Sequence, residues 1–356
     1  MGADLLKFDS KGIYCPQADV YIDPWRPVER ALITHAHSDH ARYGMKHYLA
    51  HRDTVPVMRY RLGQDINVQS IDHGDHVVIN GVKISFHPAG HIWGSCQIRL
   101  EYQGQIWVVS GDYKTQADPA CIPFEPVPCT HFITESTFGL PVYNWQAGED
   151  VFKDINQWCS DNRDEGVVSV LFGYSLGKAQ RILTGLDPSI GKIFTHGAVE
   201  NTNEVLRKNG MPLPETTLIT PELSKADFQG GIVVAPPGAG GSNWMRRFGP
   251  HRTASASGWM AMRGTRRRRN VDKGFVLSDH ADWTGLLEAI EATGAENIFV
   301  THGYTSIFTR YLREQGYNAH VVSTEYEAEL AEPVAEAAKA PESSEKDAPP
   351  EKGGQP

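Results

Sequence analysis

Three histidines and one aspartate lie within six positions of the sequence, at His35, His37, Asp39 and His40. Imidazole and carboxylate groups are the ligands that zinc and manganese commonly take in proteins. On an extended or turning segment, the first two histidines can reach one metal ion while Asp39 and His40 reach a second. A lone histidine is more often an ordinary core or surface residue. This cluster, however, directly follows a predicted strand at 31–34 and so indicates a dinuclear metal site.

Three residues further along the chain, His91, Asp112 and His302, are candidates for the remaining ligands. Each follows a predicted strand, and open α/β sheets place their ligands at the C-terminal ends of strands. Taken singly, each also fits an ordinary turn, because Asp and Gly favour turns. Their shared position is the reason to group them, and Asp112 is a natural bridging carboxylate.

The elements that must position these residues change character along the chain. The first ~140 residues read as short strands separated by turns, the pattern of a β-rich layer, and Asn80-Gly81 favours a hairpin. From about Asn144 the pattern becomes a parallel α/β alternation. Strands are predicted at 19–22, 31–34, 77–79, 82–86, 105–110, 167–172, 191–195, 231–235, 274–277 and 297–301, and helices at 150–162, 178–186 and 283–293.

Composition restricts the class of protein. With 356 residues, 40% of them hydrophobic, the chain can bury a large core and is expected to form two domains. The five cysteines show no CxxC spacing, so neither a disulfide framework nor a thiolate zinc site is expected, and a reducing cytoplasm is the simplest location. We expect no signal peptide and no membrane span.

The net charge of −9 is concentrated at the C-terminus, since Glu325 to Pro356 holds nine acids and three lysines and leaves only −3 elsewhere. That segment has almost no bulky apolar residues, so a disordered acidic tail is predicted over 326–356. An acidic total therefore does not exclude a nucleic-acid partner.

The run His35-x-His37-x-Asp39-His40, followed by His91, Asp112 and His302, resembles the ligand set of the metallo-β-lactamase fold. The resemblance implies an α/β core of four layers, with a β-sandwich between helices (αββα). Asp23, in Ile22-Asp23-Pro24, matches the early aspartate that supports the ligand loop of that fold, although it could also be a plain turn residue. The implied ligands of two divalent metal ions, zinc or manganese, are His35, His37 and His91 for one, Asp39, His40 and His302 for the other, and Asp112 for both.

A long insertion points to one branch of this fold. About 165 residues separate Asp112 from His280, much of them with an α/β pattern of their own, which resembles the cap of the β-CASP branch. Glu135, His280 and His302-Gly303 match that branch's acidic motif and its two histidine motifs, in order, over roughly residues 13 to 325. We therefore predict a core of residues 1–140 and 269–325, interrupted by a β-CASP cap over 141–268.

The resemblance implies hydrolysis of a phosphodiester. Such cleavage needs a nucleophile, neutralisation of charge and a proton for the leaving oxygen, and a two-metal site with Asp39 and Asp112 supplies the first two. His280, oriented by Glu135, is predicted to donate the proton. The alternative for His280 is a structural contact between cap and core.

Segments 12–16, 21–27 and 133–141 resemble the bacterial ligase-associated DNA exonucleases. This implies a DNA exonuclease of DNA repair that works alongside an ATP-dependent DNA ligase and a helicase. His302 points the other way, because RNA-processing β-CASP enzymes carry His there and eukaryotic DNA-repair members typically carry Val. An RNA nuclease of the same branch, a catalytically silent nucleic-acid-binding scaffold and a small-molecule thioesterase or lactamase remain the alternatives.

Several cationic and aromatic residues are candidate nucleic-acid contacts. The arginines could track phosphates, and the N-terminus of the predicted helix at Lys178 could attract an anion, as could the glycine-rich loop 237–243. The segment before Lys178 and the loop 237–243 could equally be tight turns. The aromatic residues could stack on bases, although such residues more often belong to the core. The candidates are Arg263, Arg266, Arg267, Arg268, Arg269, Arg246, Arg247, Lys178, Tyr174, Trp244 and Trp259. Five further histidines are expected to be structural: His73, His76, His87, His131 and His196.

Overall fold

The computed structural model describes residues 4–322, apart from the side chain of Arg266. The tail predicted over 326–356 lies outside the described residues. Within the described part, no helix combines the length and the apolar character that crossing a membrane requires.

The first sheet carries the candidate ligand loop at the end of a parallel strand. Its strands β1 to β3 pair in antiparallel fashion, whereas β3 to β6 are parallel. The β4 strand therefore ends at the same sheet edge as β3, which brings the loop after Ile33 next to Asp23. In order, the strands are β1 (Lys7–Asp9), β2 (Gly12–Cys15), β3 (Val20–Ile22), β4 (Arg30–Ile33), β5 (His47–His51) and β6 (Val68–Ile71).

The second sheet brings together segments that are far apart in the sequence. Strand β11 pairs in parallel with both β10 and β18, so the chain on either side of the insertion meets in one sheet. The strand order is β19 (Asn318–Val321), β18 (Asn297–Gly303), β11 (His131–Ser136), β10 (Gln105–Val109), β9 (Cys96–Tyr102), β8 (Val82–Pro88) and β7 (His76–Ile79).

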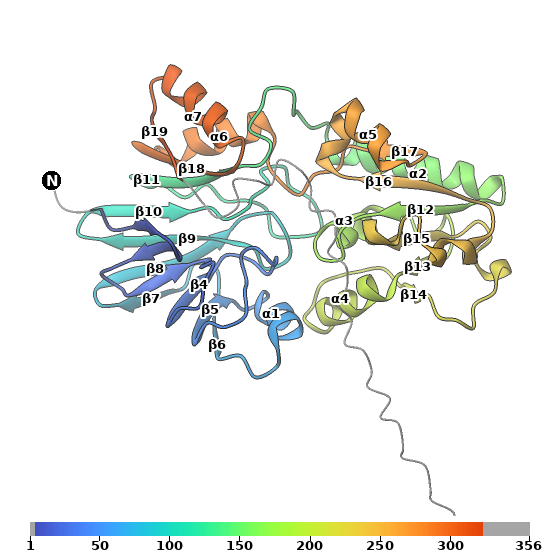
Figure 1. Cartoon of the computed structure of the whole chain (residues 1–356), viewed down its shortest axis with the longest axis horizontal. Helices are drawn as coiled ribbons and strands as arrows, with labels where there is room; N and C mark the ends of the chain where they lie inside the picture. Colours follow the sequence, from blue (N-terminus) through green and yellow to red (C-terminus); the bar gives the residue numbers. More distant parts are fainter. Residues whose placement is uncertain (1–3, 323–356) are drawn as a thin grey trace, which may run out of the picture.

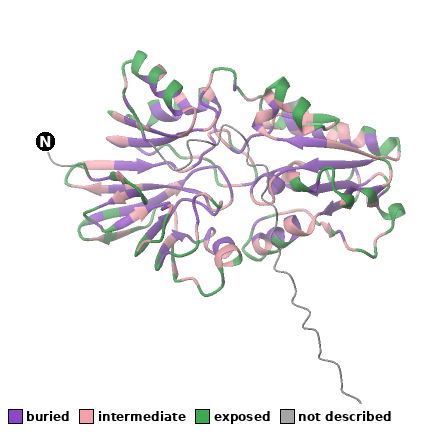
Figure 2. Cartoon of the chain, viewed as in Figure 1, coloured by how far each residue is buried: buried purple, intermediate pink, exposed green. Residues whose placement is uncertain are grey.

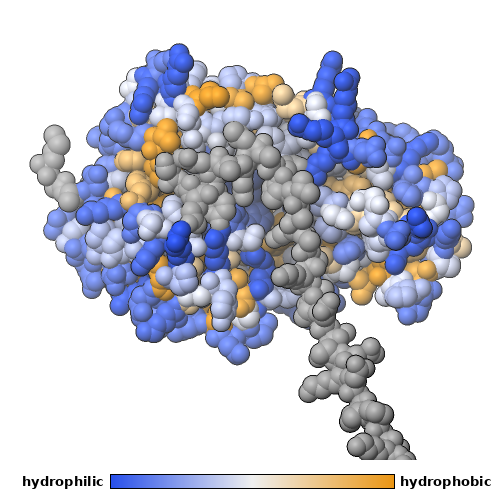
Figure 3. Space-filling model, viewed as in Figure 1, coloured by the Kyte–Doolittle hydropathy of each residue, from blue (hydrophilic) through white to orange (hydrophobic). Residues whose placement is uncertain are grey.

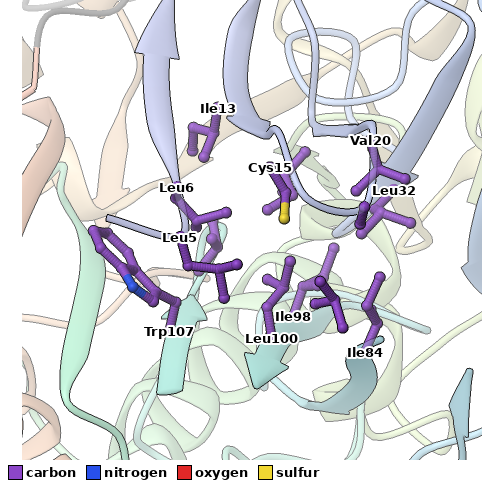
Figure 4. Packing of buried hydrophobic residues seen from close by; sticks show 14 of the residues in the cluster. Leu5, Leu6, Ile13, Cys15, Val20, Leu32, Ile84, Ile98, Leu100 and Trp107 are labelled. Atoms are coloured by element: carbon purple, nitrogen blue, oxygen red, sulfur yellow. The ribbon is translucent and has the colours of Figure 1, made fainter. Parts of the chain in front are cut away.

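The two sheets pack face to face over an apolar core (Figure 4). Cys15, Val20 and Leu32 of the first sheet meet Ile98 and Leu100 of the second, all of them buried. Helix α1 (Val55–Leu62) covers the outer face of the first sheet, and α6 (Trp283–Thr293) and α7 (Thr305–Glu314) cover that of the second. These four layers confirm the predicted αββα core.

The inserted segment forms a third sheet of six parallel strands, separate from the sandwich (Figure 1). Its central strands, such as β12 with the pattern VSVLF, are buried throughout, as expected for a parallel sheet covered on both faces (Figure 2). The order is β14 (Thr217–Leu218), β13 (Ile193–Thr195), β15 (Ile232–Ala235), β12 (Val168–Phe172), β16 (His251–Ala256) and β17 (Lys273–Phe275). The helices are α2 (Gly148–Asp164), α3 (Lys178–Gly185), α4 (Gly197–Lys208), α5 (Arg263–Arg269) and the 3₁₀ turns η1 (Lys225–Phe228), η2 (Pro237–Ala239), η3 (Asn243–Phe248) and η4 (Gly258–Ala261).

The end of the insertion differs from the sequence-based boundary. Strand β17, which we assigned to the second part of the core, pairs with β16 of the cap sheet. The strand is only three residues long, Lys-Gly-Phe, and so short a segment carries no pattern that assigns it to one sheet or the other. We propose that the cap ends after β17 rather than at residue 268.

Candidate active site

Six of the seven candidate ligands lie on loops that leave the sandwich at one edge, and His302 lies near the end of strand β18. The chain turns after β4, and the Ala41 amide donates to the His37 carbonyl at 2.8 Å. Tight packing fixes the other two loops at glycines with positive φ. A Cβ on Gly90 would lie 2.4 Å from the Lys114 carbonyl oxygen, and one on Gly111 would lie 2.7 Å from Thr34. Glycine is therefore required immediately before His91 and Asp112.

The structure brings His35, His37, His91 and Asp112 together as a first ligand group. The His37 Nδ1 atom lies 3.1 Å from Nε2 of His35 and 3.0 Å from Nε2 of His91. Both of those Nε2 atoms lie 3.6 Å from Oδ2 of Asp112. Two ligands of a tetrahedral zinc with bonds of about 2.0–2.1 Å are about 3.3–3.4 Å apart, so this spacing suits one small cation.

Hydrogen bonds on the far side of each ring leave these nitrogens unprotonated. Nδ1 of His91 donates to the Asp279 carbonyl at 2.7 Å, and Nε2 of His37 donates to the Leu176 carbonyl at 3.2 Å. Nδ1 of His35 faces the Thr34 hydroxyl at 3.1 Å. Burial lowers the pKa of all three imidazoles, which keeps them neutral. Unprotonated nitrogens that face one another repel, unless a cation lies between them.

Asp39, His40 and His302 form a second ligand group. Nε2 of His40 is buried without a hydrogen-bond partner, and it lies 3.5 Å from Asp39 Oδ2. The ring of His302 stacks on that of His40 with centroids 5.4 Å apart, and its backbone has a φ of 50°. A non-glycine residue held at positive φ is strained, and such strain is concentrated at functional sites.

Asp112 lies between the two groups. Its Oδ2 faces the first group, whereas its Oδ1 lies 3.5 Å from Nε2 of His40. One carboxylate therefore offers an oxygen to each group, as the sequence-based prediction of a bridging ligand requires. The two groups are compatible with divalent metal ions, and all seven predicted ligands belong to them.

Asp23 and Thr34 support both groups from behind. Asp23 accepts a hydrogen bond from Nδ1 of His40 at 2.7 Å, from the Thr34 amide at 2.8 Å and from the Thr34 hydroxyl at 2.5 Å. Its carboxylate thereby turns Nε2 of His40 toward the second group, while Thr34 links it to His35. Thr34 was not among our candidates. Its position directly before His35 is the only signal for it in the sequence.

A first prediction concerns this support. Asp23→Asn is expected to weaken cation binding at the second ligand group by roughly 10- to 100-fold, because an amide cannot hold the His40 ring as a carboxylate does. Asn tolerates the φ of 43° that Asp23 adopts. The affinity is measured by titrating the metal-free protein with Zn²⁺ or Mn²⁺. Asp19→Asn, at an exposed residue with a φ of 52°, is the matched control and should bind as wild type. Equal affinities for the two variants would contradict the role of Asp23.

Glu135 and His280 form an acid–base pair beside the ligand groups. Nδ1 of His280 lies 2.9 Å from both carboxylate oxygens of Glu135, which is buried and also accepts from the Tyr113 amide at 2.8 Å. The ring of His280 lies 4.6 Å from that of His91. Burial lowers the pKa of His280, but the Glu135 carboxylate outweighs it and the pKa rises to about 9. Asp112, Glu135 and His280 also satisfy the spacing of a metal site, but both oxygens of Glu135 are already bonded to His280.

The predicted nucleic-acid contacts are divided by the structure. Arg263, Arg267 and Arg268 are exposed on α5, Arg269 is half-buried, and the side chain of Arg266 lies outside the described residues. Figure 3 shows strongly hydrophilic side chains at the place of α5 in Figure 1. Lys178 requires a correction. Its side chain is buried, and its Nζ donates at 2.7 Å to Asp279 and to the Leu277 carbonyl, so it is closed to a phosphate.

The aromatic candidates and loops show a similar division. Trp259 packs on Phe138 with ring centroids 4.8 Å apart, and Phe138 lies 6.0 Å from the ring of His280. Trp244 packs against Phe248 in the cap and lies under the Arg247 guanidinium at 5.6 Å. Most of the glycine-rich loop 237–243 is exposed.

Comparison with known proteins supports the fold. No protein-family model matches the chain. The chain is 32% identical over 324 residues to a probable DNA ligase of Opitutus terrae. The matched region covers 90% of this chain and 31% of the ligase. It is 25% identical over 210 residues to an RNase J-like protein of Methanocaldococcus jannaschii (51% of this chain, 50% of the relative). It is 27% identical over 124 residues to the endoribonuclease YSH1 of Candida glabrata (34% and 16%).

The chain thus spans half or less of the length of each of these relatives. Among solved structures, it resembles a protein of unknown function from Enterococcus faecalis V583 with a TM-score of 0.58 at 11% identity. That likeness covers 83% of this chain and 79% of the other and shows the fold alone. The four-layer core and the inserted parallel sheet of this chain, together with these relatives, support a metallo-β-lactamase core with a β-CASP cap.

Proposed function

We propose that this chain is a metal-dependent nuclease that hydrolyses phosphodiester bonds of DNA as an exonuclease in DNA repair. The observation that carries the proposal is the shared Asp112 carboxylate between two ligand groups, with the His280–Glu135 pair beside them. Divalent cations, zinc or manganese, supply when bound the Lewis acidity that activates water and offsets the charge of the phosphate. The two ligand groups would hold them: His35, His37 and His91 in one, Asp39, His40 and His302 in the other, with Asp112 in both.

The residues of the chain perform the remaining steps. His280, kept protonated by Glu135, stands beside the first ligand group and donates a proton to the leaving O3′ or O5′ of the substrate. Two backbone amides, those of Tyr113 and Thr137, hold Glu135 in turn, so the ring of His280 has one orientation. Asp39, at the edge of the second group, completes the carboxylate set that a two-metal hydrolase needs.

DNA is favoured as the substrate by a relative that matches along 90% of this chain. That protein is named a probable DNA ligase, and this chain spans only 31% of it. A ligase partner, and by the same resemblance a helicase, would suit an enzyme that prepares DNA ends for sealing. RNA is the second candidate, since two relatives are named an RNase J-like protein and an endoribonuclease and since His302 follows the RNA-processing pattern.

A digestion experiment separates these substrates. Matched DNA and RNA strands, labelled at the 5′ or the 3′ end, are incubated with the protein in Mn²⁺ and, separately, in Zn²⁺. We expect stepwise shortening of DNA, and a 5′-labelled strand that releases its label first would assign 5′ polarity. Cleavage of RNA alone would overturn the DNA assignment. Binding without cleavage would favour a silent scaffold, and hydrolysis of a thioester without action on either strand would favour a small-molecule hydrolase.

A second prediction concerns the exposed arginines of α5, which we propose as phosphate contacts together with Arg266 and Arg269. Replacing Arg267 and Arg268 by Gln is expected to weaken binding of DNA and to lower the slope of log K against log salt by about 2, one for each lost phosphate contact. Binding is measured in EDTA, so that no cleavage intervenes. A variant with Lys208→Gln and Arg310→Gln loses the same charge at exposed sites elsewhere and should keep the wild-type slope. An unchanged slope in the α5 variant would exclude these two residues from the interface.

A further inference from the structure

A cluster of buried charges joins the cap to the core behind the ligand loops. Two cations of the cap helix α3, Lys178 and Arg181, meet two acids, Asp118 and Asp279, with Lys114 beside them. The side chains of Lys178 and Arg181 are 3% and 1% exposed, a burial that lysine and arginine almost never reach unless they are paired, as both are here. Figure 1 shows α3 at the side of the cap that is turned toward the core.

Lys178 fixes the segment that precedes the proposed general acid. Its Nζ donates at 2.7 Å to the Leu277 carbonyl and at 2.7 Å to Asp279 Oδ1. Asp279 is the neighbour of His280, and its carbonyl accepts the hydrogen bond from Nδ1 of His91 at 2.7 Å. The Lys178 ammonium therefore holds Asp279 in place. The carbonyl of Asp279 orients His91, a candidate metal ligand, and the next residue in the chain is the proposed acid, His280.

Arg181 holds the other side of the same ligand. Its Nη2 donates to the His91 carbonyl at 2.9 Å, while its Nε is bonded to Asp118 at 2.6 Å. His91 is thus fixed through its main chain by Arg181 and through its ring by the segment that Lys178 holds. Both anchors come from one turn of a cap helix.

The loop before α3 makes a third contact with the ligand set. The Leu176 carbonyl accepts from Nε2 of His37 at 3.2 Å. Gln180 fixes this loop, because it accepts from the Gly177 amide at 2.7 Å and donates to the Ser175 carbonyl at 3.0 Å. Gly177 itself packs against Ile92 so closely that a Cβ would lie 2.5 Å from that side chain.

Stability alone is a weak reason for such an arrangement. Removing the charged side chains of lysine and arginine from water is costly, and well-packed apolar residues often stabilise a core as well as a buried ion pair does. These side chains, however, aim their hydrogen bonds at the backbone around His91 and His280. Outer contacts of this kind orient metal ligands and tune the site.

We propose that Lys178 and Arg181 are positioning residues, by which the cap completes the hydrolytic site of the core. The cap would then set the geometry of His37, His91 and His280, in addition to any surface that it offers to a substrate. This inference rests on the proposed function, since it names residues that would act through the ligand groups and through the acid of that reaction.

The test compares Lys178→Met, Lys178→Arg and Arg207→Met in the full-length protein. Arg207→Met is the matched control, because it breaks a cap ion pair with Glu200, 2.6 Å in length, that contacts neither catalytic segment. Lys178→Met is expected to weaken Zn²⁺ binding and to lower kcat, each by roughly 10- to 100-fold, with KM for DNA near wild type because Lys178 is closed to the substrate. Lys178→Arg should recover part of both losses, and the control should lose thermal stability only.

Metal binding keeps this test independent of the reaction. If the wild-type protein cleaves no nucleic acid, the proposed function fails, while Zn²⁺ titration of the same variants still decides the positioning role. Wild-type Zn²⁺ affinity in folded Lys178→Met would overturn the inference, as would a change in KM without a change in kcat. Should Lys178→Met not fold, the double variant Lys178→Met, Asp279→Asn removes both charges of the pair, and the same criteria apply to it.

Discussion

Asp112→Asn is expected to abolish most of the hydrolytic activity and to loosen both cation sites at once. The Asp112 carboxylate presents one oxygen to the first ligand group and the other to the second, at 3.5–3.6 Å from histidine nitrogens. Asn keeps the shape but replaces one oxygen by an NH₂ group, which repels a cation. Because metal ions contribute several kcal/mol to the stabilisation of such transition states, the rate should fall on the order of 10³-fold or more.

Two measurements check this expectation. Elemental analysis of the purified variant gives the metal bound per chain, and digestion of labelled DNA gives the rate. Glu200→Gln, which changes a buried carboxylate of the cap outside the ligand groups, is the control and should keep both values. By contrast, His91→Ala should lower the metal content of the first ligand group, and His302→Ala should lower that of the second. An Asp112→Asn variant with normal metal content and normal rate would refute the bridging role.

The candidate ligands could be predicted because the sequence places each of them beside a strong local signal. His35 and Asp112 follow apolar runs that read as strands, and a glycine directly precedes His91 and Asp112. Strand β12 and helix α2 were predicted within two residues of their bounds, since their apolar periods are clear. These features depend on local sequence, whereas the division of the seven ligands between two metal ions follows from the resemblance to the metallo-β-lactamase fold.

Elements that depend on distant partners were missed. Strands β5 (HYLAH) and β6 (VQSI) carry polar residues and no clean alternation. They form because β5 pairs with β4, and β6 in turn pairs with β5. Helix α4 contains two asparagines and two valines, which have low helix propensity, and it is stabilised by packing on the cap sheet. Tertiary context outweighed local preference in each case.

The error at Lys178 has the same origin. Its position after a glycine at the start of a helix is typical of an anion site. Its real partner, Asp279, lies 101 residues away, and no local pattern reveals that pairing. The carbonyl groups of Leu176 and Asp279, which orient His37 and His91, were equally invisible, because every residue has a carbonyl.

His280→Ala is expected to lower the rate of DNA cleavage by roughly 10²- to 10⁴-fold, the usual contribution of a general acid, while leaving the metal content near wild type. His280 lies outside both the first and the second ligand group, and its Nδ1 is bonded to Glu135, so its loss removes a proton donor and spares the seven ligands. Normal cleavage by the variant would show that His280 is a contact between cap and core.

The leaving group provides the sharper measurement. A p-nitrophenyl phosphodiester releases an oxygen that needs no proton, so the deficit of His280→Ala should shrink on that substrate if the residue is an acid. A deficit of equal size on both substrates would mean that His280 acts on the site as a whole. The same reasoning fixes a sign for pH. The Glu135 carboxylate raises the pKa of His280, and the acid is lost as pH rises through that value. Glu135→Gln should therefore move the alkaline limb of kcat to lower pH, and a limb that stays in place would assign the proton to another group.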